Sequence, residues 1–232
     1  MKSIISYISV VLLLVVTSLS ANAQAFQKGN INIDLDLGMG IYATQTSWTL
    51  GVGPFTQSGS DADGTVGTVF RLGGEYGISN KFGLGLKFGS SNYLIAEEDK
   101  DTIQSVKSTD FSINFNFHLL NAEKNDLFLT LELGGASAKW LWHEDKTFLS
   151  SAKGSGSYVA LGLTDRIFFN DNVGILFSFK YAGFNYSNIT AELSSIGKDL
   201  ASALSFLGTP SWSFDSIRLN GVYLGTGLAL KF

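Results

Sequence analysis

The sequence has no cysteine among its 232 residues, so neither disulfides nor thiol chemistry can contribute to stability or activity. It has only two histidines, His118 and His143, which leaves few candidates for a general base or a metal ligand. Its 20 acidic and 16 basic side chains leave no strongly basic face, so a nucleic-acid partner is not expected. After the N-terminal segment, no apolar run is long enough for a transmembrane helix, so any membrane insertion would have to use strands.

Residues 1–23 have the pattern of a secretory signal peptide. Lys2 supplies positive charge, Val10–Val16 is apolar, and Ala21-Asn22-Ala23 matches a small-residue cleavage site. An uncleaved membrane anchor is the alternative, but serines interrupt the apolar stretch before Val10. The sequence therefore predicts export, cleavage and a mature chain, residues 24–232, that forms a single domain.

What the mature chain has in abundance is alternation with a period of two residues. From Ile31 to Ile41 every odd-numbered residue is apolar, while the even-numbered residues are Asn, Asp or Gly. Side chains on a strand point alternately to opposite faces, so this segment predicts a strand with one apolar and one polar face. Similar alternation predicts eight strands, at 29–42, 67–78, 82–91, 107–119, 126–140, 156–168, 173–186 and 217–232.

The connections between these strands alternate in length. Short polar turns are expected at 79–81, 121–125 and 170–172, and long loops at 43–66, 92–106, 141–155 and 187–216. This asymmetry is typical of outer-membrane barrels with both termini in the periplasm. The prediction is an all-β, eight-stranded antiparallel up-and-down transmembrane β-barrel with short periplasmic turns and long extracellular loops.

A short amphipathic helix is expected in the last long loop, near 190–207. Apolar residues recur there at spacings of three and four, from Ile189 to Leu207, and Gly208 and Pro210 provide a stop. We expect the apolar stripe to pack on the barrel mouth. A lid, a contact with the outer leaflet and a partner-binding face are the alternatives.

Alternation alone does not say which face is inside, because a soluble lipocalin-like barrel would bury the apolar face. Glycines on the polar face favour a crowded, narrow lumen, with the Phe- and Leu-rich face toward lipid. Asp165 shares the lipid-facing parity, which is acceptable at the periplasmic interface or at a bulge. Aromatic residues near the strand ends are expected to form interfacial girdles: Tyr42, Tyr76, Trp140, Tyr158, Tyr181 and Phe232.

The polar parity also places charges of both signs in the lumen: Asp34, Asp36, Arg71, Glu75, Lys87, Asp110, His118, Glu132, Lys180 and Lys231. An eight-stranded barrel is just wide enough to be filled by side chains, so these groups are expected to form a paired network. We expect Arg71, Glu75, Lys87, Glu132 and Lys180 in its central layer, with Asp34 and Asp36 nearby. A gated ion path is the alternative interpretation.

Catalytic, cofactor and metal sites are not predicted. His143 lies near Glu144, Asp145, Ser150 and Ser151, as a hydrolase or a metal site would require, but surface loops are rich in serine and acid in any case. His118 lies near an expected periplasmic turn. A solvated loop is therefore the favoured interpretation of the segment around His143.

With these features, the mature chain resembles the small outer-membrane barrels of Gram-negative bacteria: OmpA-type transmembrane domains, opacity-type and Ail-type surface proteins, and OmpW-like barrels. Gly227, Leu230 and the terminal Phe232 look like the assembly signal of that group, although Gly225 and Leu230 depart from its usual pattern. The resemblance implies the bacterial cell outer membrane as location, its lipid and the barrel-assembly machinery as partners, and no cofactor.

The functional prediction is a non-enzymatic outer-membrane protein with a structural or surface-interaction role. Its long loops would meet an extracellular partner, and polar and charged side chains would largely fill its lumen. A small channel or transporter for ions or small apolar molecules is the alternative. A lipid-modifying enzyme that uses His143 or His118 is the second alternative.

Overall fold

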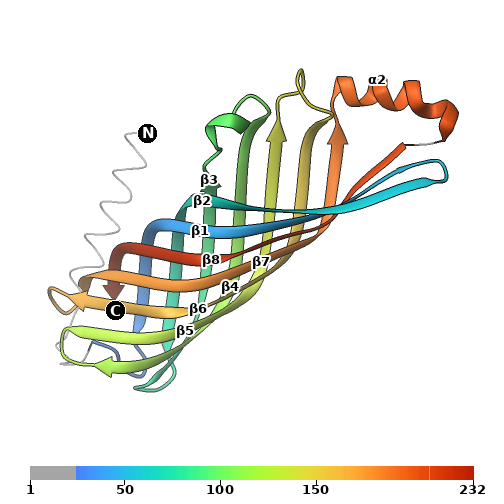
Figure 1. Ribbon diagram of the computed structural model, residues 1–232. Helices are drawn as coiled ribbons and strands as arrows, with labels where there is room; N and C mark the ends of the chain where they lie inside the picture. Colours follow the sequence, from blue (N-terminus) through green and yellow to red (C-terminus); the bar gives the residue numbers. More distant parts are fainter. Residues whose placement is uncertain (1–24, 209) are drawn as a thin grey trace.

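A closed barrel of eight antiparallel strands, each paired with its neighbours in sequence order, makes up the protein (Figure 1). The structure is a computed structural model that describes residues 25–208 and 210–232. The expected signal peptide, 1–23, lies outside the described residues. The predicted up-and-down, all-β fold is confirmed. The strands are β1 (Ile31–Val52), β2 (Phe55–Gly77), β3 (Phe82–Tyr93), β4 (Ile103–Asn121), β5 (Asn125–Trp142), β6 (Leu149–Phe168), β7 (Val173–Leu193) and β8 (Pro210–Lys231).

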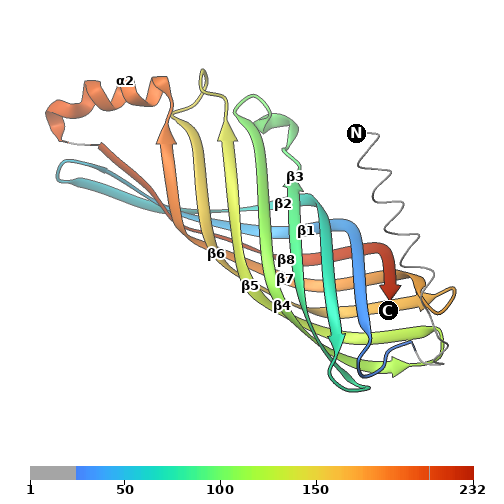
Figure 2. The same ribbon diagram turned by 180° about the vertical axis from the view of Figure 1, so that it is seen from behind.

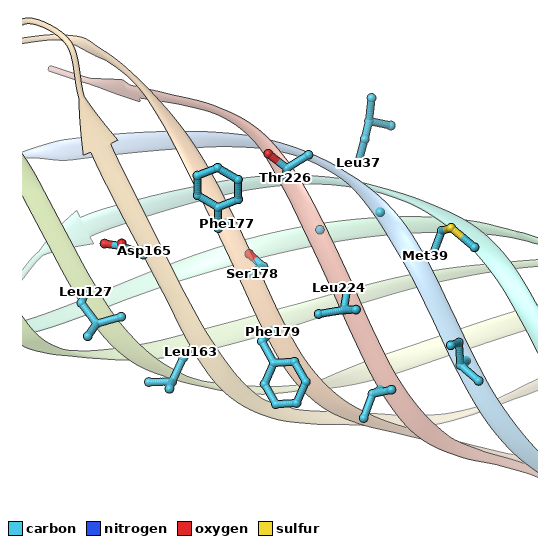
Figure 3. Close-up of a pocket in the computed structure, with 14 residues that line it drawn as sticks. Leu37, Met39, Leu127, Leu163, Asp165, Phe177, Ser178, Phe179, Leu224 and Thr226 are labelled. Carbon is cyan, nitrogen blue, oxygen red and sulfur yellow. The ribbon is translucent and has the colours of Figure 1, made fainter.

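The apolar side chains point outward and the polar side chains point into the lumen. On β4, Phe111 is 55% and Ile113 is 44% exposed, whereas the alternating residues Asp110, Ser112 and Asn114 are at most 2% exposed. Figure 3 shows the same outer wall on β6, β7 and β8, where Leu163, Phe179 and Leu224 border a shallow hollow of about 690 Å³. This arrangement is the inverse of a soluble barrel, which would bury its apolar residues.

Lumen-facing glycines make room for the strands and their charged side chains. A Cβ atom on Gly134 would lie 2.6 Å from the Cα of Ser112, and one on Gly73 would lie 2.9 Å from the Cγ of Lys87. By contrast, the outward-facing Gly74 has nothing within 4 Å of a Cβ position. The narrow interior therefore requires small residues where neighbouring groups approach closely.

The barrel has two different ends. At the turn end, short connections follow β2, β4 and β6, as predicted. At the opposite, flared end the strands run well beyond their predicted limits, and the predicted long loop 43–66 is wrong. That segment is a hairpin in which β1 and β2 pair as far as Val52 and Phe55.

Polar contacts and an apolar strip both hold this hairpin against β8, where Trp48 pairs with Phe214 and Leu50 pairs with Trp212. The Trp48 indole donates a hydrogen bond of 2.8 Å to Asp61, and the Thr49 hydroxyl donates one of 2.8 Å to Asp215 on β8. Gly53 has a φ of 59°, as a tight turn requires.

The wall of the barrel divides in two toward the flared end. Pairing between β2 and β3 stops at Gly67 and Tyr93, and pairing between β7 and β8 stops at Tyr186 and Ile217. Beyond these points β2, β1 and β8 continue as one sheet and β4 to β7 as another. Both views show the long β1–β2 hairpin leaving in one direction while β4 to β7 extend in another (Figures 1 and 2).

The connection between β7 and β8 contains the expected short helix, but over a narrower range. α2 spans Ser195–Leu204, because β7 continues to Leu193 and Ser194 caps the helix by accepting a hydrogen bond of 3.1 Å from the Gly197 N–H. The expected packing of its apolar stripe on the mouth is not observed, since Ile196 and Leu200 are exposed. No helix among the described residues is long and apolar enough to cross a membrane. Two 3₁₀ turns, Glu97–Asp99 and Ser205–Leu207, complete the structure.

Candidate functional site

A cluster of buried charges around Glu132 fills the middle of the lumen, and we call it the central cluster. Strands β2, β3 and β7 direct Arg71, Lys87 and Lys180 toward the Glu132 carboxylate, at nitrogen–oxygen distances of 2.9, 3.0 and 2.8 Å. Tyr158 on β6 donates a hydrogen bond of 2.7 Å to the same group. Glu132 is fully buried, and the side chains of the three cations are at most 6% exposed. One carboxylate thus connects side chains from four other strands.

The Arg71 guanidinium has further partners on several sides. It lies 3.6 Å from the Asp110 carboxylate on β4, and its central carbon lies 4.9 Å from the ring centre of Tyr158 and 5.4 Å from that of Tyr223. Cation–π contacts of this kind strengthen when water is excluded. Arg71 therefore joins the charged middle of the lumen to the aromatic residues nearer the flared end.

A second group of buried charges, the turn-end cluster, surrounds Arg166. The guanidinium contacts Asp34 at 2.8 Å, Glu75 at 2.7 Å and Asp126 at 3.1 Å. His118 links two of these carboxylates, because its Nε2 lies 2.9 Å from Glu75 and its Nδ1 lies 2.5 Å from Asp126. The cluster therefore spans β1, β2, β4, β5 and β6 in a single layer.

The segment before β1 closes the turn end over this cluster. The Phe26 ring is fully buried and stacks on His118, with ring centres 3.4 Å apart and planes 10° from parallel. The Phe26 N–H donates a hydrogen bond of 2.8 Å to the Asn121 side chain, and the Ala25 N–H donates one of 2.9 Å to the Ala122 carbonyl. We call residues 25–30 the N-terminal latch.

Little free space remains between the two clusters. Asp34, Asp36, Arg71 and Lys87 line a cavity of about 10 Å³, which is at the lower limit for one water molecule. The charged side chains therefore leave little free space where the two clusters meet.

The flared-end half of the lumen is aromatic. Tyr42, Tyr158, Phe184 and Tyr186 are at most 2% exposed and form one packed group with Tyr93. The predicted interfacial girdle is therefore wrong for Tyr42 and Tyr158, which face inward, and Trp140 also packs against this group. These aromatic residues occupy lumen parity, where their size helps to fill the barrel. Tyr76 and Tyr181 do lie on the outer wall.

A cavity of about 210 Å³ lies on the flared-end side of this aromatic group, where the wall of the barrel divides. Its lining includes the apolar or aromatic side chains of Trp140, Tyr186, Ile217 and Leu219. The β1–β2 hairpin contributes Thr44, Asp63 and Thr65, and the segment after β3 contributes Leu94, Ile95 and Ala96. The cavity thus lies between the two sheets of the flared end.

The structure divides the predicted network differently from the expectation. Arg71, Lys87, Glu132 and Lys180 meet in the central cluster, but Glu75 belongs to the turn-end cluster with Asp34. Asp36 is buried beside the small cavity. Lys231 faces the lumen, with its ammonium 4.9 Å from the Phe168 ring centre.

Arg166 and Asp126 were missed by the sequence reasoning. The alternation contains the signal for Arg166, since it shares the parity of the lumen-facing Thr164, while its neighbour Asp165 points to the outer wall near the end of β6. Asp126 shares the parity of Glu132 on β5. Both residues lie at strand ends, where pattern-based boundaries are least certain.

The residues around His143 lie between β5 and β6 and at the start of β6. His143, Glu144, Ser150 and Ser151 border an open hollow of about 510 Å³, but in the described part of the chain the imidazole makes no hydrogen bond to the others. The described residues contain no group of three or more His, Cys, Asp or Glu side chains that could hold a metal ion. His118 is engaged by two carboxylates inside the lumen.

The residues of the expected assembly signal lie on the strand that closes the barrel. Gly227 pairs with Asp36 on β1, and Leu230 pairs with Ile33. Phe232 exchanges backbone hydrogen bonds of 2.8 and 3.0 Å with Ile31. Recognition of this end by an assembly machinery remains a prediction.

Comparison with known proteins identifies similar folds but no similar sequences. No protein-family model matches the chain, and no curated protein sequence matches it significantly. The structure resembles the outer membrane protein OprG from Pseudomonas aeruginosa, with a TM-score of 0.56 and 13% identity over 89% of this chain and 97% of that chain. Lower similarity relates it to the outer membrane protein AlkL, with a TM-score of 0.48 and 14% identity over 93% of this chain and 94% of that chain. The outer membrane protease OmpT from Escherichia coli has a TM-score of 0.46 and 13% identity over 93% of this chain and 99% of that chain.

At identities this low, structural similarity is evidence for a shared fold and not for a shared function. The similarity to OprG is the evidence for the fold. The common features are the closed ring and the up-and-down order of eight antiparallel strands. The chain therefore has the fold of the small eight-stranded outer-membrane β-barrel proteins.

Proposed function

We propose that this protein is a non-enzymatic outer-membrane barrel with an ion-tight lumen, which acts as a structural or surface-interaction protein through its flared end. The observation that carries the proposal is the filled lumen. The central cluster, the turn-end cluster and the N-terminal latch lie in the turn-end half, where the cavity among Asp34, Asp36, Arg71 and Lys87 measures about 10 Å³. An ion would have to separate these buried pairs to pass.

The exposed apolar wall supports placement in the outer membrane. Phenylalanine and leucine side chains cover the outside of the strands nearest the turn end, as lipid contact requires. The short turns would then face the periplasm and the flared end would face the outside.

The flared end has the surface that a contact role needs. The three-stranded extension of β2, β1 and β8 carries the exposed apolar residues Phe55 and Trp212 among polar side chains, and α2 carries the exposed apolar residues Ile196 and Leu200, followed by the exposed Phe206. An exposed apolar stripe on a polar surface is typical of a site that meets another molecule.

Planar-bilayer recording tests the proposal. We expect the folded wild-type protein to produce no conductance steps over a wide voltage range, because an ion would have to separate the buried charge pairs of both clusters. A difference in gel migration between the unboiled and the boiled protein would show that the barrel is folded, and an added channel-forming protein would show that the membrane can report opening. Reproducible steps that depend on this protein would contradict the ion-tight lumen.

A second candidate function is the binding and sideways passage of small apolar molecules. The observation that favours it is the cavity of about 210 Å³ lined by Trp140, Tyr186, Ile217 and Leu219, at the level where β2 parts from β3 and β7 parts from β8. Concave sites with a mainly apolar lining and a few polar groups, here including Thr44, Asp63 and Asp99, bind small ligands. Such a molecule would enter from outside and leave through the divided wall, without crossing the central cluster.

Tryptophan fluorescence tests the second candidate. In a variant with Trp48, Trp142 and Trp212 changed to phenylalanine, we expect 1-bromohexane to quench Trp140 saturably. Ala138→Phe should abolish saturation, because Ala138 lines the cavity and is 6% exposed. The matched control is Ser137→Phe, which adds the same ring on the outer face. Equal quenching in the Ala138→Phe and Ser137→Phe proteins would exclude this cavity as the site.

A further inference from the structure

Three lysines stand side by side on the outer face of the barrel. The register places Lys107 on β4 directly opposite Lys139 on β5, and Lys139 directly opposite Lys153 on β6. All three are exposed on the outward parity. We call these residues the lysine row.

Such a row is unfavourable unless an anion neutralises it. Like charges directly opposite each other on neighbouring strands are destabilising, because their Cβ atoms are about 4.5–5.5 Å apart. Within residues 25–208 and 210–232, none of the three ammonium groups forms an ion pair, whereas the exposed Lys100 and Lys146 each pair with an acid. The lysine row therefore presents concentrated positive charge toward the surroundings of the barrel.

The lysine row lies just beyond the apolar wall. Between the last large apolar residue and the lysine, each strand has only small or hydroxyl-bearing outward residues. From the wall toward the flared end, the outward positions are Phe111, Thr109 and Lys107 on β4, Leu133, Gly135, Ser137 and Lys139 on β5, and Val159, Ser157, Ser155 and Lys153 on β6.

These small residues leave a hollow of about 420 Å³ between the wall and the lysine row. Phe88 and Phe111 border it on the apolar side, and Gly135, Ser137 and Ser155 form its floor. A second hollow, of about 510 Å³, is lined by Lys139, Lys153, Gln104 and Trp142. Glu144 and Glu192 also line it, but Glu192 accepts a hydrogen bond of 3.2 Å from Ser151.

We propose that this face binds a phosphorylated glycolipid of the outer leaflet, with its phosphates on the lysine row, its sugar in the 420 Å³ hollow and its acyl chains along Phe88 and Phe111. This inference rests on the proposed placement in the outer membrane. Charge complementarity identifies the headgroup as anionic, and continuity with the apolar wall identifies the ligand as a lipid. The hydroxyls of Thr109, Ser137 and Ser155 supply hydrogen-bond partners for the sugar.

The test compares lipid binding by two charge-matched variants of the full barrel. The first carries Lys107→Met, Lys139→Met and Lys153→Met. The control carries Lys28→Met, Lys81→Met and Lys124→Met, which removes three exposed lysines at the turn end. The probe is fluorescently labelled, diphosphorylated lipid A in detergent micelles, and the readout is fluorescence anisotropy against protein concentration.

Binding by the wild type and the control is expected to be equal, with at least about tenfold weaker binding by the lysine-row variant. Added salt should weaken the wild-type complex. Dephosphorylated lipid A should remove the difference between the variants, and inorganic phosphate should not compete at concentrations matched to the lipid. Equal binding of lipid A by both variants would overturn the inference, as would equally effective competition by inorganic phosphate.

Two further measurements separate failure of this inference from failure of the proposed function. Unboiled gel migration reports whether the lysine-row variant is folded, and co-flotation with phospholipid vesicles reports whether the wild type inserts. A barrel that inserts but binds lipid A without regard to the lysine row overturns the lipid site alone. A wild-type chain that stays out of vesicles overturns both.

Discussion

Replacement of Glu132 by alanine is expected to lower the free energy of unfolding by about 3–5 kcal/mol, because it leaves buried cations without their shared partner. Arg71, Lys87 and Lys180 all contact this one carboxylate, and no bulk water reaches them. Their mutual repulsion would act in a medium of low effective dielectric constant. The measurement is the urea concentration at the midpoint of unfolding in lipid or detergent. The fraction folded at each urea concentration is read from the difference in gel migration between unboiled and boiled samples.

Two comparisons make the Glu132 prediction specific. Glu97→Ala removes an exposed carboxylate that pairs with Lys100, and it should change stability by less than about 1 kcal/mol. Adding Lys180→Met to Glu132→Ala should recover part of the loss, since one uncompensated cation is removed. If Glu132→Ala and Glu97→Ala unfolded at the same urea concentration, the central cluster would not stabilise the barrel.

Replacement of Phe26 by alanine is expected to admit water at the turn end. A buried phenylalanine typically contributes about 3–5 kcal/mol over alanine, and here its loss would act mainly on local opening of the N-terminal latch. The natural chain has no cysteine, so Asn116→Cys provides a unique reporter inside the lumen, two residues before His118 on β4. A charged methanethiosulfonate reagent should modify this cysteine roughly tenfold faster, or more, when Phe26 is alanine.

The control for Phe26 is another phenylalanine near the same end of the barrel. Phe82 begins β3, faces outward and contacts Phe117, so Phe82→Ala removes a ring of equal size without opening the lumen. Equal modification rates in the Phe26→Ala and Phe82→Ala proteins would show that the N-terminal latch does not seal the turn end.

The lipid-facing part of the barrel was predictable because each strand there has two different faces. Phe111, Ile113 and Phe115 alternate with Asp110, Ser112 and Asn114. A shift of the strand register by one residue would turn the apolar side chains into the lumen, so the alternation defines which face points outward. The flared end was not predictable in this way. In the hairpin the apolar residues Trp48, Leu50 and Val52 lie on even positions, whereas the apolar residues of β1 from Ile31 to Ile41 lie on odd positions. The alternation therefore changes parity along β1, and the segment was interpreted as a loop.

The sequence predicted which charged residues face the lumen, but not which of them lie at the same height along the barrel axis. Parity alone identifies Glu75 and Glu132 as inward residues, whereas the stagger of the strands decides which charges share a level. That stagger brings Glu75 to Arg166 and Glu132 to Arg71. The Phe26 contact had no periodic signal, because the ring belongs to a short segment before the first strand and meets residues distant in sequence.

Closure of the ring through β1 and β8 has a kinetic consequence. Asn32 pairs with Lys231, and Ile31 bonds to Phe232, so the final seam joins nearly the first and the last described residues. Contacts between residues so far apart in the sequence form slowly, because the entropy lost in closing a long loop comes before the favourable contacts form. Until β8 pairs, β1 and β7 each present an unpaired row of backbone donors and acceptors, which favours aggregation of the incomplete barrel.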